Sequence, residues 1–264
     1  MTLTQKSGQA LSTLPLVAGQ ASLQAISIGQ IAAETLAAEQ QGFVLGCTSR
    51  GVFVKPGGRW VVFVSRERFR GPLTVTLPGG DSRLGAVSPG MPVGITSELI
   101  AIPGAGVNIS TRGCEVWQAP PPSTKSRRGM NPARARVYPA QSLAFANNLL
   151  GSGQGLTPAG DDVVIGLLLS LNRWEEVLWP SGQLHEWNRQ IVEAAYQRTT
   201  TLSANLIECA TRGQGDERLI AAVDHLVCGG SRSSKIITDL QKWGSSSGRA
   251  ALVGMRIANG YSWY

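Results

Sequence analysis

The sequence predicts an α+β protein in which a β-rich N-terminal half, an antiparallel sandwich or barrel, is followed by an α-helical C-terminal domain. Between residues 43 and 117, short β-branched or aromatic runs recur about every ten residues, separated by Gly, Pro or Ser turns. After residue 139 the apolar residues recur at helical spacing, and glycines separate the segments. A basic, proline-rich stretch lies between the two patterns.

These patterns predict three regions along the chain. Residues 1–119 form a β-rich domain with an N-terminal helix over 21–40, where Leu23, Ile26, Ile31 and Leu36 stand among alanines. Residues 120–138 form a basic, Pro-rich linker, and residues 139–264 form a helical domain that carries a Gly-rich loop. The expected strands cover 43–47, 51–55, 60–64, 73–77, 91–95, 99–102, 107–110 and 114–117. The expected helices, joined as an antiparallel bundle, cover 139–150, 158–174, 184–198, 202–211, 216–227, 234–243 and 247–258.

The composition is that of a globular protein, with 42% hydrophobic and 16% charged residues in a chain of 264. The formal net charge is +7, but five of the basic residues lie in the acid-free segment 120–136, which leaves +2 for the remainder. That segment lacks the interleaved aromatic residues that stack on bases, so we expect no nucleic-acid partner. Two interpretations stay open for it: a solvated linker, or a surface that docks an acidic partner or an anionic substrate. The same choice, a solvated face or the wall of an anion site, applies to the arginines of segment 66–72.

Location and cofactors are only weakly constrained by the sequence. We see no leader peptide and no apolar run long enough to cross a bilayer, so no membrane partner is expected. The four cysteines are scattered without a CxxC pair, and only two histidines are present, which indicates a reduced, cytoplasmic protein without a metal site. The cofactors stay unknown.

The most informative stretch is residues 151–162, Gly-Ser-Gly-Gln-Gly-Leu-Thr-Pro-Ala-Gly-Asp-Asp, which leads into the apolar run 163–171. Alternating glycines let a backbone turn sharply or approach a ligand closely. Thr157 occupies the expected N-cap and Pro158 the first position of a mostly buried helix. Free N–H groups at a helix start bind anions, although the pattern also fits a purely structural junction. The candidate substrate-binding residues here are Gly153, Gly155 and Thr157.

Asp161 and Asp162 are the candidate catalytic residues. Neighbouring residues of a helix point about 100° apart, so one carboxylate can face a pocket while the other binds loop N–H groups. A pocket-facing Asp could hold Mg²⁺ with water and substrate oxygens, act as a base toward an amide or amine, or serve only as a partner of the helix dipole. Because the dipole and the loop amides stabilise a carboxylate, we expect an ionised Asp rather than a proton donor.

Two other helix starts share this chemistry: Thr199-Thr-Thr-Leu-Ser203 and Gly244-Ser-Ser-Ser-Gly248. Each offers hydroxyl groups and unpaired backbone N–H groups, which suit a carboxylate or phosphate. If the three helix starts converge, they form a shared pocket; otherwise they are ordinary caps. The further candidate substrate-binding residues are Thr200, Ser203, Asn205, Ser246 and Ser247.

The run GQGLTPAGDDVVIGLLL, together with the stretches 199–206 and 244–254, resembles a bacterial family, long a domain of unknown function, that is linked to a subunit of oxamate carbamoyltransferase in anaerobic allantoin degradation. The resemblance implies a subunit that binds oxamate, oxalurate or carbamoyl phosphate with the other subunits of a carbamoyltransferase complex. The residues themselves indicate only a small anionic metabolite. The alternative interpretation is a non-catalytic scaffold or a small-ligand-sensing protein in which the Gly-rich loop is structural.

Overall fold

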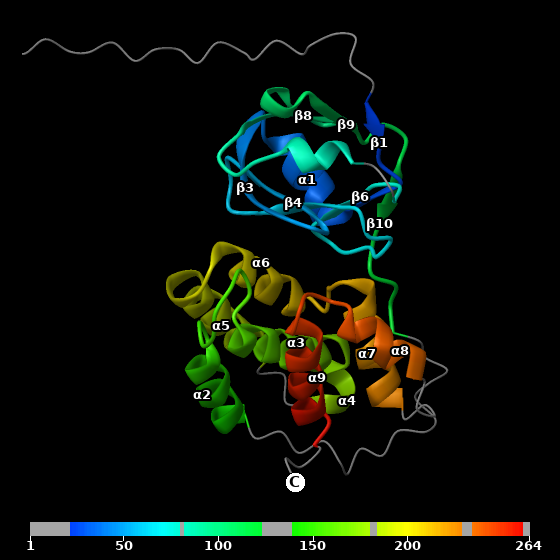
Figure 1. The fold of residues 1–264 in the computed structure, drawn as a ribbon. Coiled ribbons are helices and arrows are strands. Elements are labelled where there is room, and N and C mark those ends of the chain that lie inside the picture. Colours follow the sequence, from blue (N-terminus) through cyan, green and yellow to red (C-terminus); the bar gives the residue numbers. More distant parts are fainter. Residues whose placement is uncertain (1–21, 80–81, 123–138, 180–183, 229–233, 261–264) are drawn as a thin grey trace, which may run out of the picture.

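A computed structural model of the protein describes residues 22–79, 82–122, 139–179, 184–228 and 234–260. It confirms the α+β class, because a curled ten-stranded sheet fills the first part of the described chain and helices fill the second, below the sheet in Figure 1. We call residues 22–122 the sheet half and residues 139–260 the helical half. Most of the expected linker, residues 123–138, lies outside the described residues.

The strands of the sheet half follow the eight expected runs to within a few residues. Their order across the sheet is β1-β9-β8-β7-β3-β4-β5-β6-β2-β10, and most pairs are antiparallel; β1–β9, β5–β6 and β2–β10 are parallel. The short 3₁₀ turns η1 (Arg83–Ala86) and η2 (Pro103–Ala105) join strands. The strands are β1 (Leu23–Gln24), β2 (Ser27–Gly29), β3 (Gln41–Thr48), β4 (Gly51–Pro56), β5 (Val62–Ser65), β6 (Thr74–Thr76), β7 (Pro92–Thr96), β8 (Leu99–Ile102), β9 (Val107–Ser110) and β10 (Glu115–Trp117).

The expected helix over residues 21–40 is wrong in its first part. Residues 23–29 form the strands β1 and β2, and the helix α1 covers only Gln30–Ala38. Leu23, Ala25 and Ser27 are buried while Gln24 and Ile26 are exposed, which is the two-residue period of a strand. The alanines and isoleucines of this stretch fit both periods, so the sequence pattern alone did not separate them.

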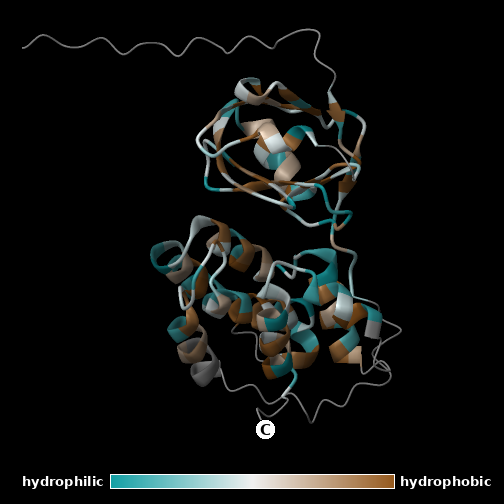
Figure 2. Ribbon diagram, in the orientation of Figure 1, coloured by the Kyte–Doolittle hydropathy of each residue, from teal (hydrophilic) through white to brown (hydrophobic). Residues whose placement is uncertain are grey.

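The first segment of the chain also explains why the sheet curls. β1 lies at one end of the strand order and β2 lies next to the other end, yet only residues 25 and 26 separate them. The two ends of the sheet therefore meet along this segment, and α1 lies within the ring of strands in Figure 1. Ala32 and Leu36 of α1 join the buried core of the sheet, which includes Val44, Val64 and Ile100. Figure 2 shows hydrophobic residues, in brown, along the strands of the sheet.

The helical half contains the expected helices and one additional short helix, α4. Among the described residues, none of the helices combines the length and apolar character needed to cross a bilayer. The helices are α2 (Pro139–Leu149), α3 (Ala159–Arg173), α4 (Glu175–Leu178), α5 (Leu184–Arg198), α6 (Thr201–Ala210), α7 (Glu217–Cys228), α8 (Ser234–Gln241) and α9 (Ser247–Ala258).

The central helix of this half is α3, whose residues are buried on nearly every face. It packs most closely against α9, and the two helices run in the same direction: Thr157 lies beside Ser247 and Gly166 beside Ala251. A Cβ atom on Gly166 would lie 2.0 Å from the carbonyl oxygen of Ala251, so the close approach requires glycine. This pair departs from the expected antiparallel bundle, because five further helices of the described chain separate α3 from α9 and no short connection fixes their direction. Both N-termini consequently lie at the same end.

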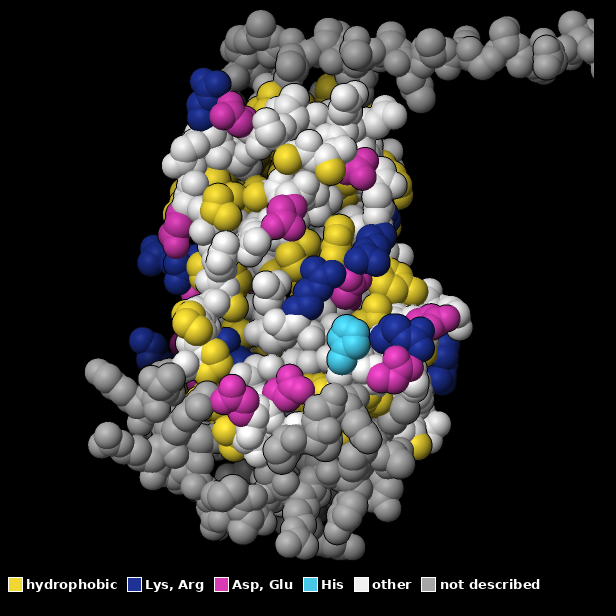
Figure 3. All heavy atoms as spheres, turned by 180° about the vertical axis from the view of Figure 1, so that it is seen from behind, with side chains coloured by type: hydrophobic (Ala, Val, Ile, Leu, Met, Phe, Trp, Pro, Cys, Tyr) yellow, Lys and Arg dark blue, Asp and Glu magenta, His cyan; other side chains and the backbone are white. Residues whose placement is uncertain are grey.

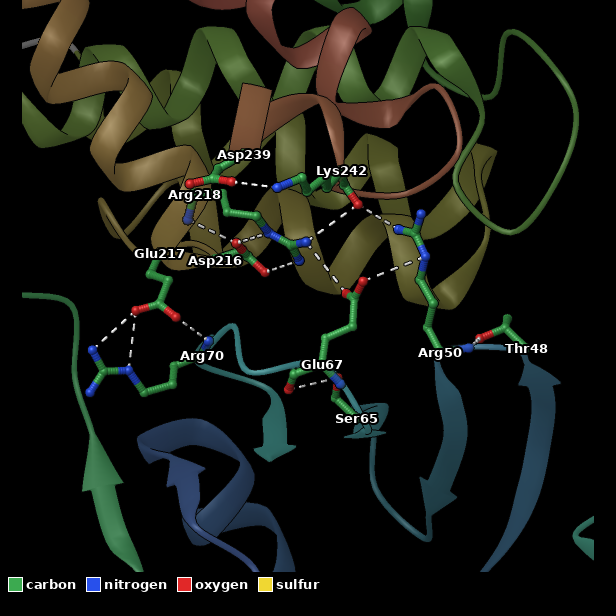
Figure 4. Close-up of polar contacts among 10 residues, drawn as sticks. All are labelled: Thr48, Arg50, Ser65, Glu67, Arg70, Asp216, Glu217, Arg218, Asp239 and Lys242. Atoms are coloured by element: carbon green, nitrogen blue, oxygen red, sulfur yellow. Dashed lines mark hydrogen bonds and ion pairs between the residues drawn. The ribbon is translucent and has the colours of Figure 1, made fainter. Parts of the chain in front are cut away.

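The two halves are joined by buried polar contacts, part of which Figure 4 shows. The Arg218 guanidinium, 6% exposed, donates to both carboxylate oxygens of Asp216 (2.8 and 2.7 Å) and to Glu67 of the sheet half (3.4 Å). Arg70 of the sheet half donates to Glu217 from its side chain (3.1 and 3.0 Å) and from its backbone (2.8 Å). Arg70 and Glu67 of the basic segment 66–72 therefore contribute to an interface between the halves, which neither interpretation anticipated, whereas Arg68 is exposed.

Candidate functional site

The helix α3 begins one residue later than the sequence predicted. Pro158 is the N-cap, and its carbonyl accepts the amides of Asp161 (2.9 Å) and Asp162 (3.2 Å). Thr157 does not cap the helix; its hydroxyl lies 3.2 Å from the hydroxyl of Ser247 instead. Proline is tolerated at this position because it needs no amide partner there. The hydroxyl of Thr157 is thus available to a group outside its own helix.

The structure brings the starts of α3, α6 and α9 together. Besides the Thr157–Ser247 contact to α9, the Thr200 hydroxyl at the start of α6 donates to the carbonyl of Leu156 (2.6 Å). Thr200 also accepts from the amide of Ser203 (3.1 Å), so it caps α6 in the expected way. The positive ends of three helix dipoles therefore point toward one region, which favours negative charge there.

Asp161 holds the glycine loop to its neighbours. One carboxylate oxygen accepts the amide of Gly151 (2.7 Å), and the other accepts the hydroxyl of Thr199. The side chain is fully buried. Both oxygens are thus used by protein donors, as expected for the Asp that binds loop N–H groups. Thr199 was not among the predicted site residues, although the run of three threonines at 199–201 indicated hydroxyl donors.

Asp162 is equally buried but has no such partners. Neither of its carboxylate oxygens makes a hydrogen bond to another described residue. Burial raises its pKa to about 7, nearby Asp161 raises it further, and the hydroxyls of Ser247 and Thr157 partly oppose the shift. The expectation of an ionised Asp is therefore wrong for Asp162, because desolvation outweighs the helix dipoles. Near neutral pH this carboxyl can donate or accept a proton.

The loop that precedes Asp162 carries unused backbone donors. Gly151, Gly153 and Gly155 have φ angles of 75°, 123° and 98°, which other residues rarely adopt. Residues 152–156 are exposed, and the amides of residues 153–156 donate no hydrogen bond to another described residue. The Leu156 side chain is 44% exposed. These amides are therefore free to donate to a ligand that lies against the loop.

The remaining predicted residues divide between the site and other parts of the helical half. Ser203 is fully buried and its hydroxyl has no partner among the described residues, while Ser246 is the exposed N-cap of α9. Asn205 lies elsewhere: its side chain accepts from the amide of Val61 (2.8 Å) and donates to the carbonyl of Arg59 (3.2 Å). Asn205 therefore joins the two halves and is not brought together with the loop.

A separate surface pocket of about 720 Å³ lies between α5, α6 and the Arg59 segment of the sheet half. Its buried carboxylate, Glu208, accepts from Arg59, Arg212 and the Tyr196 hydroxyl (2.8 Å). Burial and Glu208 together raise the pKa of Tyr196 to about 12. Sequence reasoning did not single out these residues, because the arginines that pair with Glu208 come from both halves. Their charges are satisfied within the protein.

The described surface offers limited support for a large charged partner. On the face shown in Figure 3, acidic side chains lie close to the basic ones. Across the described residues, basic groups such as Arg112 and Arg189 are paired with carboxylates. No group of three or more His, Cys, Asp or Glu residues within the described part of the chain is arranged to hold a metal ion.

Residues 149–259 match the family model of the oxamate carbamoyltransferase subunit AllH. The matched range runs from the end of α2 to the end of α9 and includes the glycine loop with all three helix starts. Comparisons with curated proteins and with solved structures found no match. The family match confirms the resemblance inferred from the loop sequence, and it relates the helical half to a subunit of oxamate carbamoyltransferase; the sheet half lies outside the matched range.

Proposed function

We propose that this protein is a subunit of an oxamate-carbamoyltransferase-like enzyme and binds a small anionic metabolite at the start of α3. The metabolite would be oxamate, oxalurate or carbamoyl phosphate. The observation that supports the proposal most is the meeting of three helix starts close to Asp162, a buried carboxyl without a hydrogen-bond partner in the described part of the chain. The region lies within the range that matches the oxamate carbamoyltransferase subunit.

Each part of the region has a role in this proposal. The amides of residues 153–156 donate to the carboxylate or phosphate of the ligand, because they have no acceptor among the described residues and lie at a positive helix end. The hydroxyls of Thr157 and Ser247 line the path to Asp162 and separate when the ligand enters. Asp161 keeps the loop in place, so of the two candidate catalytic residues only Asp162 is left to contact the ligand.

Partners follow from the same proposal. A protein related to one subunit of an enzyme acts with others, so the isolated chain is expected to bind the metabolite and to turn over little of it. Adding the other subunits of the complex should restore carbamoyl transfer. Full turnover of carbamoyl phosphate by the isolated chain would contradict the shared-site form of this proposal. A cytoplasmic location, expected from the scattered free cysteines, is part of the proposal.

The alternative is a non-catalytic scaffold or ligand sensor in which the loop is structural. The contacts of Asp161 favour it for one part of the loop, since they fasten Gly151 to the segment before α6. They do not account for the unpartnered oxygens of Asp162, which a purely structural junction would leave at a cost of about 1–3 kcal/mol.

A matched pair of glycine variants separates these two functions. Gly155→Ala places a methyl group in open space but opposes a φ angle of 98°, so the loop amides turn away from the ligand. Gly90→Ala in the sheet half imposes the same kind of strain, with a φ angle of 84° and open space around the Cβ atom. Titration calorimetry of the full chain with oxamate and carbamoyl phosphate should show binding that Gly155→Ala weakens about tenfold or more, which corresponds to one or two lost hydrogen bonds. Gly90→Ala should leave binding unchanged.

The effect of these two variants on binding decides between a ligand-binding loop and a structural loop. Equal binding by both variants would favour a structural loop, and no binding of either metabolite to the wild-type chain or to its complex would contradict the proposed function. Melting temperatures of the two variants provide the control, because similar strain should lower both by similar amounts.

A further inference from the structure

The chemistry of Asp162 narrows the kind of ligand that the site accepts. Both oxygens of its carboxyl group are buried and have no hydrogen-bond partner among the residues that the structure describes, whereas both oxygens of the adjacent Asp161 accept hydrogen bonds. A single donor would pair with only one of these oxygens. The two unpaired oxygens of Asp162 therefore fit a ligand group that contacts both of them at once.

The protonated carboxyl group presents one O–H donor and one carbonyl acceptor side by side. A primary amide presents the complementary pair, an N–H donor next to a carbonyl acceptor, so the two groups can form two parallel hydrogen bonds. Carboxylate or phosphate alone offers acceptors only and would leave the carbonyl oxygen of Asp162 unpaired. The hydroxyls of Thr157 and Ser247 contact each other at 3.2 Å and lie close enough to Asp162 to lower its pKa, but neither is within hydrogen-bonding geometry of its carboxyl oxygens.

We propose that Asp162 binds, as a carboxylic acid, the primary amide of the ligand while the amides of residues 153–156 hold the ligand's anionic end. This inference rests on the proposed function and adds the group that determines specificity. The ligand class is a small molecule in which a carbamoyl or amide group adjoins a carboxylate or phosphate. Asp162 is then the residue that distinguishes such a molecule from an anion of the same shape without an N–H group.

The titration of Asp162 gives this binding a defined pH dependence. Burial is the main cause of its raised pKa of about 7; Asp161 on the same helix adds to it, and the hydroxyls of Ser247 from α9 and Thr157 from the loop oppose it. Arg198, which precedes Thr199 at the end of α5, and Arg249, in the first turn of α9, are exposed and are not among the groups that shift it. Since the protonated form binds the amide, affinity should be full below pH 6 and fall about tenfold between pH 6 and pH 8.

Oxamate and pyruvate provide the test, because they share shape and charge and differ by an amide NH₂ in place of a methyl group. Titration calorimetry of the full chain at pH 6.5 should show oxamate binding about 10- to 100-fold more tightly than pyruvate, the size expected when a buried acceptor is left unpaired. Asp162→Ala should reduce this preference to less than about threefold. Asp162→Asn should retain most of it, since an amide side chain can pair with an amide, and should remove its pH dependence.

Proton uptake gives a second readout that does not depend on affinity. At pH 8, oxamate binding to the wild-type chain should take up close to one proton, measured from the heats in buffers of different ionisation enthalpy, and binding to Asp162→Asn should take up none. Equal affinity for oxamate and pyruvate, or a preference that survives in Asp162→Ala, would overturn the inference while leaving anion binding at the loop in place. Failure of both ligands to bind would instead overturn the proposed function.

Discussion

Buried polar groups are paired at the contact between the two halves, whereas at the start of α3 a buried carboxyl has no hydrogen-bond partner among the described residues. At the contact, Arg218, Asn205 and Glu208 are each at least nine-tenths buried, and their polar groups pair with partners from both halves. At the start of α3, Asp162 is buried just as deeply and pairs with nothing described. Satisfied buried polar groups fix a structure, whereas an unsatisfied one is a cost that a protein retains where a function needs it.

The largest expected effect on the free energy of unfolding follows from the titration of Asp162. Its carboxyl has a pKa near 3.8 when unfolded and about 7 when folded, so the folded state holds a proton that the unfolded state releases between these values. Stability should therefore be greatest below pH 4 for this group and fall by up to about 4 kcal/mol as the pH rises to 7, with no further loss above. Other acids contribute opposite slopes, so the measurement is the difference between wild type and Asp162→Asn in urea unfolding at several pH values. If the free energies of unfolding of the two proteins changed in parallel with pH, Asp162 would not carry the expected cost of an unpaired buried carboxyl, and the contrast with the contact between the halves would be lost.

The contact between the halves should respond most strongly to the loss of Arg218. Arg218→Met leaves Asp216 and Glu67 without their main cation, and breaking a buried ion pair from one side typically costs about 3 kcal/mol. For a protein of this size that corresponds to a fall in melting temperature of roughly 6–12 °C. Arg189→Met is the matched control, because Arg189 is exposed and pairs only within α5, and its melting temperature should stay close to that of wild type. Similar shifts for both variants would show that the contact is no more stabilising than the surface.

Asp161 and Asp162 allow a paired and an unpaired buried carboxyl group to be compared at adjacent positions. Asp161→Ala leaves the Gly151 amide and the Thr199 hydroxyl without their acceptor, at an expected cost of about 2 kcal/mol. Asp162→Ala removes a carboxyl that has no hydrogen-bond partner within the described ranges, so at pH 8 it should be neutral or stabilising. Thermal unfolding of the two variants side by side measures the contrast. A larger loss for Asp162→Ala than for Asp161→Ala would mean that the roles of the two residues are reversed.

Much of the fold was predictable because local periods determine it. The eight strand runs and the main helices appeared where turn residues and apolar spacing indicated, and the similar chemistry of residues 151–162, 199–203 and 244–248 pointed to three helix starts that the structure brings together. Residues 23–29 were misassigned because their small apolar residues satisfy both the strand period and the helix period.

The division of roles within the site was less accessible from sequence. Which of two adjacent aspartates faces the loop donors depends on where Thr199 lies, and that is set by the packing of α6 against α3 and α5. The same limit applies to Asn205, predicted to bind substrate, whose amide contacts residues 59 and 61 of the other half. Long-range pairing of polar groups leaves no local period in a sequence, so it becomes visible only with the tertiary structure.

The smallest expected effect on stability is that of replacing Thr200 at the start of α6. Its hydroxyl caps α6 and also donates to the carbonyl of Leu156 in the loop. Thr200→Ala removes both contacts, and because the residue is only half-buried and water can replace them, the loss in unfolding free energy should be about 1 kcal/mol. Thr200→Ser keeps the hydroxyl and should retain most of that stability, which urea unfolding at pH 7 can measure. If Thr200→Ser were as destabilised as Thr200→Ala, the methyl group rather than the hydroxyl would stabilise this helix start, and the loop would not depend on Thr200 for its position.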